Sequence, residues 1–324
     1  MNLLPSSHFF TAVKRPEYFF WSAALLAFIL FIQAGGEPSP SSDESLTAGV
    51  ATARVEKKAD PFSLISLEAK SAAVYDVRND IFLYDRMGDI PRPLASITKI
   101  MTAVTALSLV PDGTLITITP EALKQEGDTG LRADEAWPIK DLLRFMLLES
   151  SNDAAYAISS TVGSIGASVE NPEFGRGFFI ARMNQQAKEM DLTSTYFLNE
   201  SGLDISDTAP GSVSTAREVS YLLARSFTRY PFIFQSTRLG ELTFHNENGD
   251  ERIATNTNKD TEKVPLLIAS KTGYTDLAGG NLVIAFEAGF DYPIIVSVLG
   301  STMDGRFTDA EKLVWATLEF LEQR

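Results

Sequence analysis

The 324-residue chain has no cysteine and only two histidines, His8 and His245. The absence of cysteine excludes disulfides, thiolate nucleophiles, iron–sulfur clusters and cysteine-ligated zinc. With so little imidazole, a multi-histidine metal site is almost impossible, and a Ser–His–Asp triad would have to use one of these two residues. If the chain is a hydrolase, we therefore expect a group other than histidine to activate its nucleophile.

Positive charge is also in short supply. The sequence has 28 lysines and arginines against 42 aspartates and glutamates, which gives a net charge of −14. A surface this negative repels phosphate backbones, so we expect no nucleic-acid partner. Apolar residues make up 44% and charged residues 22%, a globular balance that excludes a wholly disordered chain.

One long apolar run occupies residues 18–34 (YFFWSAALLAFILFIQA), preceded by Lys14 and Arg15. A helix that spans a bilayer needs about 17–25 apolar residues, and positive charge before it favours a cytoplasmic N-terminus. We therefore interpret residues 1–17 as cytoplasmic and residues 18–34 as a single-pass signal anchor in the cell membrane, with the rest of the chain on the extracytoplasmic side. A cleaved signal peptide is the alternative, because small residues follow the run.

Residues 35–59 are rich in serine, proline and charge and lack a sustained apolar period, which is typical of a flexible linker. The remaining residues, 60–324, are enough for one sizeable domain with its own core.

Within that domain, strand patterns lie at both ends and helical patterns between them. Helical spacing of apolar residues occurs at residues 96–109, 139–158, 174–190, 214–226 and 308–322, the last with Thr308 as its expected N-cap. Strand patterns occur at 72–76, 81–84, 242–244, 252–254, 282–286 and 293–299. This order predicts an α/β fold of the α+β type, with an antiparallel sheet built from both ends of the domain and a helical subdomain inserted.

The first segment with candidate catalytic residues is Ser96-Ile97-Thr98-Lys99. Pro93 stops any preceding helix, so we expect Ser96 at or near a helix N-terminus, on the same face as Lys99. A lysine amine with a depressed pKa can take the proton of a serine hydroxyl, and the N–H groups of a helix N-terminus suit an oxyanion. By itself, however, the pattern favours a capped helix with an exposed lysine.

Two further segments carry polar groups at sharp transitions. Ser150 and Asn152 follow an apolar stretch and could serve as proton relay and substrate donor, or simply form a polar helix junction. On a strand edge, Lys271-Thr272-Gly273 offers a fixed positive charge, a hydroxyl donor and room for close backbone approach, or simply a strand that ends in a turn.

Together, S-x-x-K, S-x-N and K-T-G in this order form the signature of penicillin-binding proteins and serine β-lactamases. The surrounding sequence, from about Ser71 onward, resembles the D-alanyl-D-alanine carboxypeptidases, which are low-molecular-weight penicillin-binding proteins. The resemblance implies a β-lactamase/transpeptidase-like fold and hydrolysis of peptidoglycan stem peptides ending in D-Ala-D-Ala. It also implies covalent inhibition by β-lactams, with no metal and no organic cofactor.

The same resemblance implies a role for each motif residue. Ser96 would be the acylated nucleophile and Lys99 its general base, with Ser150 and Asn152 on the opposite wall. Substrate binding would fall to Lys271, Thr272, Gly273, Tyr274 and, unless it has only a surface or packing role, Arg306. The oxyanion hole would combine the Ser96 N–H with an N–H on the strand after Gly273.

Two departures from the family pattern stand out. Ser151 occupies a position where the family usually has glycine, so we expect a slightly different relay wall. The chain also ends soon after its last helix, without the β-rich C-terminal domain of many relatives, so we expect anchoring through the N-terminal segment.

Other functions use the same residues. A D,D-endopeptidase cannot be separated by sequence, and a catalytically inactive wall-binding protein is also possible. A class A-like β-lactamase would need a carboxylate that directs the deacylating water. Glu189 superficially resembles that residue, but it continues a helical pattern, so we expect it to be an exposed helix residue.

Overall fold

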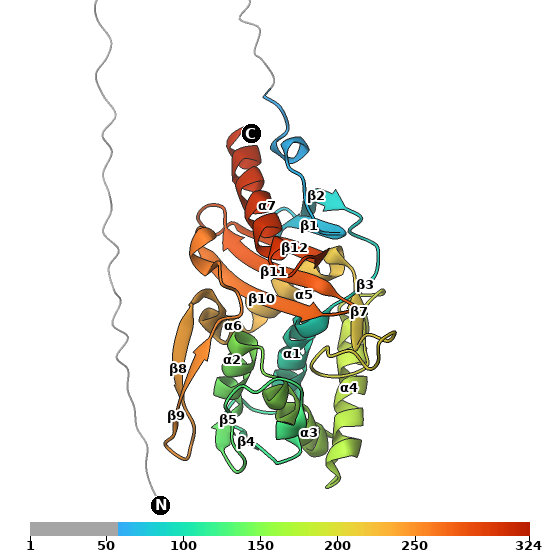
Figure 1. Cartoon of the computed structure of the whole chain (residues 1–324), viewed down its shortest axis with the longest axis vertical. Coiled ribbons are helices and arrows are strands. Elements are labelled where there is room, and N and C mark those ends of the chain that lie inside the picture. The colour runs from blue at the N-terminus through green and yellow to red at the C-terminus, as the bar shows by residue number, and fades with distance from the viewer. Residues whose placement is uncertain (1–57) are drawn as a thin grey trace, which may run out of the picture. The chain divides into compact units, whose positions relative to one another are not determined.

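The central sheet joins strands from the two ends of the domain. The computed structural model describes residues 58–324. In it, five antiparallel strands follow the order β10-β11-β12-β1-β2 (Figure 1). Their bounds are β1 Ser71–Asp76, β2 Ile81–Arg86, β10 Leu267–Thr275, β11 Gly279–Glu287 and β12 Pro293–Ser301. The pairing of β1 with β12, in which Val74 lies opposite Val296, confirms the predicted sheet built from both ends.

The expected cytoplasmic segment, the anchor at residues 18–34 and nearly all of the linker lie outside the described residues. Within residues 58–324, no helix has the length and apolar character needed to cross a membrane.

Both faces of the sheet are covered, which explains why its middle strands read as near-continuous apolar runs. On one face, Val74, Ile284 and Val296 pack in a cluster with Leu313 of α7 (Gly305–Glu322). On the other face, alternate residues of the same strands join the larger core that includes α5 (Ala216–Arg229).

The start of α7 differs from the sequence prediction. The helix begins at Gly305, three residues before the expected cap, so the assignment of Thr308 as N-cap is wrong. The hydroxyl of Thr302 accepts a hydrogen bond from the Gly305 N–H at 2.9 Å. This bond satisfies a first-turn donor from outside the helix, so Thr308 falls inside the first turn.

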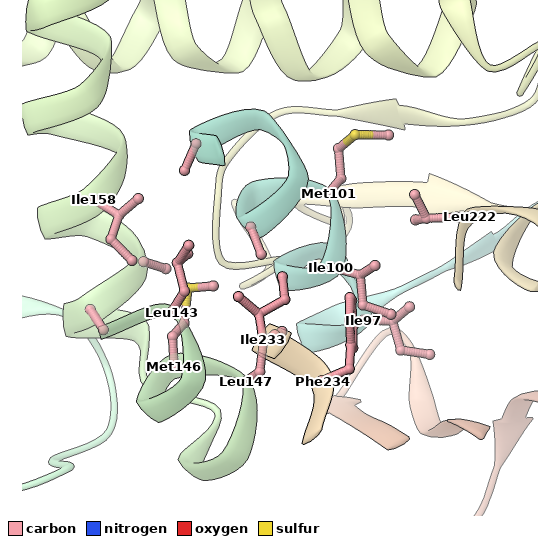
Figure 2. Close-up of a cluster of buried hydrophobic side chains, with 14 of the residues drawn as sticks. Ile97, Ile100, Met101, Leu143, Met146, Leu147, Ile158, Leu222, Ile233 and Phe234 are labelled. Carbon is pink, nitrogen blue, oxygen red and sulfur yellow. The ribbon is translucent and has the colours of Figure 1, made fainter. Parts of the chain in front are cut away.

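The helical subdomain surrounds α1 (Lys99–Leu109), which follows the 3₁₀ turn η2 (Ala95–Thr98). The residues of α1 point into the core on almost every side, as a central helix requires (Figure 2). The packed side chains come from η2, α1, α2 (Ile139–Glu149), α3 (Asn152–Ala167), α5 and α6 (Pro231–Phe234). They include Ile97, Ile100, Met101, Leu143, Met146, Leu147, Ile158, Leu222, Ile233 and Phe234.

The helical stretch at 139–158 is divided into α2 (Ile139–Glu149) and α3 (Asn152–Ala167). Ser150 separates them, because it adopts the left-handed conformation with φ of 64°. Ser151 then caps α3 by accepting a hydrogen bond from the Ala154 N–H at 3.1 Å. The junction places the S-x-N motif at the end of one helix and the start of the next.

The other predicted helices and the hairpin are confirmed within a few residues. They are α4 (Pro172–Glu189), α5 and the hairpin of β8 (Glu241–His245) and β9 (Glu251–Thr255). Short strands complete the fold: β3 Arg92–Pro93, β6 Tyr196–Phe197 and β7 Ser212–Ser214 form one small sheet, and β4 Leu115–Thr117 and β5 Ala136–Pro138 form another.

Candidate active site

Ser96 and Lys99 lie together, as their spacing predicts. Lys99 Nζ is 2.8 Å from Ser96 Oγ, 2.6 Å from Asn152 Oδ1 and 2.9 Å from the Ser201 carbonyl oxygen. The orientation of the Asn152 amide is fixed on its other side, where Nδ2 donates to the Glu126 carbonyl at 2.6 Å. Lys99 therefore faces three oxygens, of which only the Ser96 hydroxyl carries a proton.

This arrangement determines where a neutral amine directs its lone pair. A neutral lysine has two N–H donors and one lone pair, and the oxygens of Asn152 and Ser201 can only accept. The two N–H groups would bind these acceptors, so the lone pair would point at the Ser96 hydroxyl. The geometry thus suits proton transfer from Ser96 to Lys99.

The burial of Lys99 favours that neutral form. Its side chain is completely excluded from solvent. Burial lowers the pKa of Lys99 to about 7, while the nearby Glu200 carboxylate opposes part of this shift. An amine with this pKa is substantially unprotonated at neutral pH, as a general base requires.

Lys271 of β10 contacts Ser150 directly. Its Nζ donates to Ser150 Oγ at 2.8 Å and to the Thr272 carbonyl at 2.9 Å. Burial, followed by repulsion from Lys99 and Arg306, lowers the pKa of Lys271 well below its ordinary value. The positive charge expected of Lys271 is therefore not fixed: an anionic ligand at this position would stabilise the ammonium.

Gly273 brings β10 against the turn that carries Ser96. A Cβ at this position would lie 2.7 Å from the Leu94 carbonyl oxygen and 3.2 Å from the Ser96 nitrogen. Only glycine allows two backbones to approach this closely. The contact brings the edge strand beside the Ser96 N–H, where the sequence predicts the oxyanion hole.

The remaining predicted binding residues differ in exposure. Thr272 is buried, and its hydroxyl bonds to Thr257 Oγ1 at 2.6 Å, whereas Tyr274 is 44% exposed. Arg306 is buried, and its Nη1 donates to the Gly273 carbonyl at 2.8 Å. Arg306 therefore lies behind the K-T-G strand rather than on the open surface.

A cavity of about 430 Å³ adjoins this strand. Its lining includes Glu126, Leu203, Asp204, Tyr274 and Leu277. Because Glu126 also holds Asn152 and Tyr274 follows Gly273, the cavity provides space beside the motif residues for a bound molecule.

Several contacts in the site were missed by sequence reasoning. Asn281 of β11 donates to the carbonyls of Pro93 and Leu94 at 2.9 and 3.1 Å, and it accepts from the Gly300 N–H at 2.7 Å. A lone asparagine inside the apolar strand 279–287 was the available signal. No sequence pattern could have identified the carbonyls of Glu126 and Ser201, because every residue type carries a backbone oxygen.

Ser151, at the position where the resemblance led us to expect glycine, is accommodated without strain. Its φ of −60° is open to any residue, and its buried hydroxyl bonds to Thr129 Oγ1 at 2.8 Å in addition to capping α3. The Ser151 hydroxyl therefore makes two hydrogen bonds beside Asn152.

Glu189 lies at the end of α4 and pairs with Arg182 at 2.8 Å, with about half of its side chain exposed. This confirms the expectation of an exposed helix residue and removes the candidate for a deacylating carboxylate. Across the described part of the chain, no group of three or more acidic or histidine side chains could hold a metal ion.

Comparisons with known proteins agree with the motif assignment. The profile of the family described as D-alanyl-D-alanine carboxypeptidase, peptidase family S11, matches residues 54–303. The D-alanyl-D-alanine carboxypeptidase DacB2 of Mycobacterium tuberculosis is 27% identical over 240 residues, covering 73% of this chain and 77% of that protein. The D-alanyl-D-alanine endopeptidase of Escherichia coli is 32% identical over 225 residues, covering 66% of each.

Among solved structures, penicillin-binding protein D2 from Listeria monocytogenes in its ampicillin-bound form has a TM-score of 0.64 and 28% identity, covering 78% of this chain and 98% of its own. The fold resemblance therefore extends over most of the domain. The predicted family and fold are confirmed. This chain belongs to the D-alanyl-D-alanine carboxypeptidase family, the S11 serine peptidases, which have the penicillin-binding protein fold.

Proposed function

We propose that the chain is a membrane-anchored D-Ala-D-Ala carboxypeptidase that trims peptidoglycan stem peptides through an acyl-enzyme on Ser96. The observation that carries the proposal is the contact of 2.8 Å between Ser96 Oγ and the buried amine of Lys99. It provides a base for the serine in a chain that has almost no histidine.

In the first step, Ser96 Oγ attacks the carbonyl carbon of the peptide bond between the two D-alanines. Its proton passes to Lys99 Nζ as the bond forms, and the carbonyl oxygen becomes an oxyanion. The Ser96 N–H and an N–H of β10 after Gly273 stabilise that oxyanion. The position of Gly273 against Ser96 supports this assignment.

In the second step, the carbon–nitrogen bond breaks and the amine of the leaving D-Ala takes a proton. Lys99 gives up the proton that it took from Ser96, and Ser150, whose hydroxyl accepts a hydrogen bond from Lys271 at 2.8 Å, relays that proton to the amine. Water then attacks the ester carbonyl of the acyl-enzyme, releases the shortened peptide and restores the Ser96 hydroxyl. Asn152 keeps Lys99 in place throughout.

The terminal carboxylate of the substrate binds at the K-T-G strand. Lys271 and Thr272 provide an ammonium and a hydroxyl there, and Arg306 supports the strand through the Gly273 carbonyl. A bound carboxylate also stabilises the protonated form of Lys271, which burial otherwise disfavours.

The proposed location of the enzyme rests on its N-terminal sequence and its proposed substrate. Residues 18–34 would anchor it in the membrane, and the catalytic domain would face the cell wall, where stem peptides occur. Removal of a cleaved signal peptide remains the other possibility for this segment.

The test is release of free D-alanine from a stem pentapeptide by the purified full-length chain. We expect release by the natural chain and none by Ser96→Ala. Release that persists in Ser96→Ala would disprove the proposed mechanism. If neither the natural chain nor Ser96→Ala releases D-alanine, the result favours an inactive wall-binding protein.

A D,D-endopeptidase is the second candidate, because the family includes endopeptidases such as the E. coli relative at 32% identity. A cross-linked muropeptide dimer separates the two functions: the endopeptidase cuts it into monomers, and the carboxypeptidase does not. Binding of β-lactams is supported by the ampicillin-bound relative. Rapid turnover of penicillin instead of stable acylation would indicate a β-lactamase.

A further inference from the structure

The segment after β6 provides a backbone oxygen to Lys99 and also carries a buried carboxylate. The Ser201 carbonyl accepts from Lys99 Nζ at 2.9 Å, and the preceding Glu200 carbonyl accepts from Thr102 Oγ1 at 2.6 Å. Lys99 and Thr102 lie three residues apart on α1, so two consecutive peptide units bind the same face of that helix. The placement of the Ser201 carbonyl therefore depends on how Glu200 is held.

The Glu200 side chain is held by α4. It is 1% exposed, and its two carboxylate oxygens accept from Arg176 Nη2 at 3.3 and 3.2 Å. A carboxylate removed from water is strongly destabilised unless it has a cationic partner. Arg176 thus provides the cationic partner that the buried Glu200 carboxylate needs.

Arg176 is itself fixed on its other side. Its Nη1 donates to Glu173 Oε2 at 2.9 Å, and its guanidinium lies 4.6 Å from the centre of the Tyr156 ring. The Tyr156 hydroxyl donates to Glu173 Oε1 at 2.7 Å, which completes the group. The counter-charge of Glu200 is therefore held by residues that do not belong to the three motifs.

We propose that Glu200 and Arg176 are positioning residues for Lys99, which keep the Ser201 carbonyl on its amine and set the balance of charge behind it. The inference rests on the proposed function, in which Lys99 accepts the proton of Ser96. Neither residue is part of a motif: Glu200 precedes Ser201 in the segment 198–203, and Arg176 lies near the start of α4.

The charges of Glu200 and Arg176 act on the pKa of the Lys99 amine in opposite directions. Burial lowers the pKa of Lys99, and the Glu200 carboxylate raises it. The elements packed around the amine also carry Lys271 on β10, Asp153 on α3 and Arg176 on α4. Of these, Arg176 directly offsets the charge of Glu200.

Removal of one charge at a time gives shifts of opposite sign. The acid limb of the pH profile is the range over which the acylation rate rises as Lys99 loses its proton. Glu200→Gln removes the negative charge, so the pKa of Lys99 falls and this limb moves to lower pH. Arg176→Gln leaves Glu200 without its counter-charge, so the pKa of Lys99 rises and the acid limb moves to higher pH. A merely structural role would lower the rate without moving the two limbs apart.

The experiment measures the rate constant for acylation of the full-length chain by a fluorescent penicillin across a range of pH. We expect the limb of Glu200→Gln to move down, and that of Arg176→Gln to move up, by at least roughly half a pH unit. Two variants serve as matched controls and should leave the limb in place: Arg176→Lys, which keeps the charge, and Arg182→Gln, which removes the partly exposed α4 partner of Glu189.

Limbs that stay together, or that move in the same direction, would overturn the inference. Thermal unfolding of each variant shows whether it folds. Arg176→Gln leaves the buried Glu200 carboxylate without this partner, whereas Glu200→Gln removes the buried negative charge. If Arg176→Gln does not fold, the inference is judged on the shift in Glu200→Gln. If the natural chain is not acylated at any pH, the proposed function fails. If it is acylated with an acid limb that the variants do not shift, only the positioning role fails.

Discussion

The amine of Lys99 lies 2.8 Å from the hydroxyl oxygen of Ser96, and no part of that lysine side chain reaches solvent. The other two oxygens around the amine, on Asn152 and Ser201, can only accept hydrogen bonds. A neutral amine in this position has its lone pair free only toward Ser96. This relationship lets a serine act as nucleophile without histidine.

The acid limb of acylation should therefore report Lys99. Burial lowers its pKa to about 7, so we expect the acylation rate to rise with pH along a limb with a midpoint near 7. The sign follows from the lone pair: below the midpoint the amine is protonated and cannot accept the proton of Ser96. The measurement is the rate of β-lactam acylation against pH, and a rate that stays flat to about pH 5 would argue against Lys99 as the base.

Lys99→Arg tests the need for a base that can lose its proton. A guanidinium stays protonated at neutral pH and cannot accept the proton of Ser96. We therefore expect acylation to slow by a factor of about 10² to 10⁴. Lys124→Arg, at an exposed position, is the matched control and should react like the natural chain. A loss of less than about tenfold in Lys99→Arg would contradict the assigned role.

Gly273→Ala tests the close approach of β10 to Ser96. The added Cβ would meet the Leu94 carbonyl oxygen at 2.7 Å, so the strand must move away from the Ser96 N–H. We expect a loss in acylation rate of roughly tenfold to a hundredfold, because small displacements at a reacting centre are costly. Gly240→Ala, where a Cβ meets nothing within 4 Å, should have no effect, and equal rates in the two variants would refute the explanation.

Asn281→Ala tests the support of the turn before Ser96. The substitution removes the donor to the Pro93 and Leu94 carbonyls and the acceptor of the Gly300 N–H. We expect the free energy of unfolding to fall by about 2–4 kcal/mol, since buried polar groups lose their partners. Urea denaturation measures the change, and a loss below about 0.5 kcal/mol would show that these bonds contribute little.

Ser151→Ala tests the unusual residue of the S-x-N motif. Loss of the cap on α3 should lower stability by about 1 kcal/mol, whereas Ser151→Gly should cost only a few tenths. Acylation rates should remain close to those of the natural chain in both variants, because neighbouring Asn152 keeps its bond to Lys99. Chemical denaturation and acylation are measured together; a large loss of rate with unchanged stability would mean that the Ser151 hydroxyl takes part in the reaction.

The sequence was sufficient to predict the main helices and four strands of the central sheet, β1, β2, β11 and β12, but its list of strand patterns did not include β10. Apolar runs in β1, β11 and β12 are buried on both faces, so their pattern carries the topology directly. The start of α7 was predicted wrongly because its first donor is satisfied by Thr302 from outside the helix. Local cap patterns do not reveal such a partner.

The sequence predicted the motif side chains of the candidate site, but not the other groups that surround them. The three motifs identified Ser96, Lys99 and Lys271, but not the distances among them. The backbone oxygens of Glu126 and Ser201 depend on loop placement, and the Arg176–Glu200 pair joins segments that are separate in the sequence. Burial also changed one expectation, because it lowers the pKa of Lys271 where a fixed positive charge was predicted.

The most direct test of the central claim is to find the residue that becomes acylated. The full-length chain is treated with penicillin, digested, and the adduct is located by mass spectrometry. We predict one adduct, on the peptide that contains Ser96, with no adduct in Ser96→Ala and formation slowed by about 10² to 10⁴ in Lys99→Arg. An adduct on a different residue, or D-alanine release by a chain that never forms an adduct, would contradict the account.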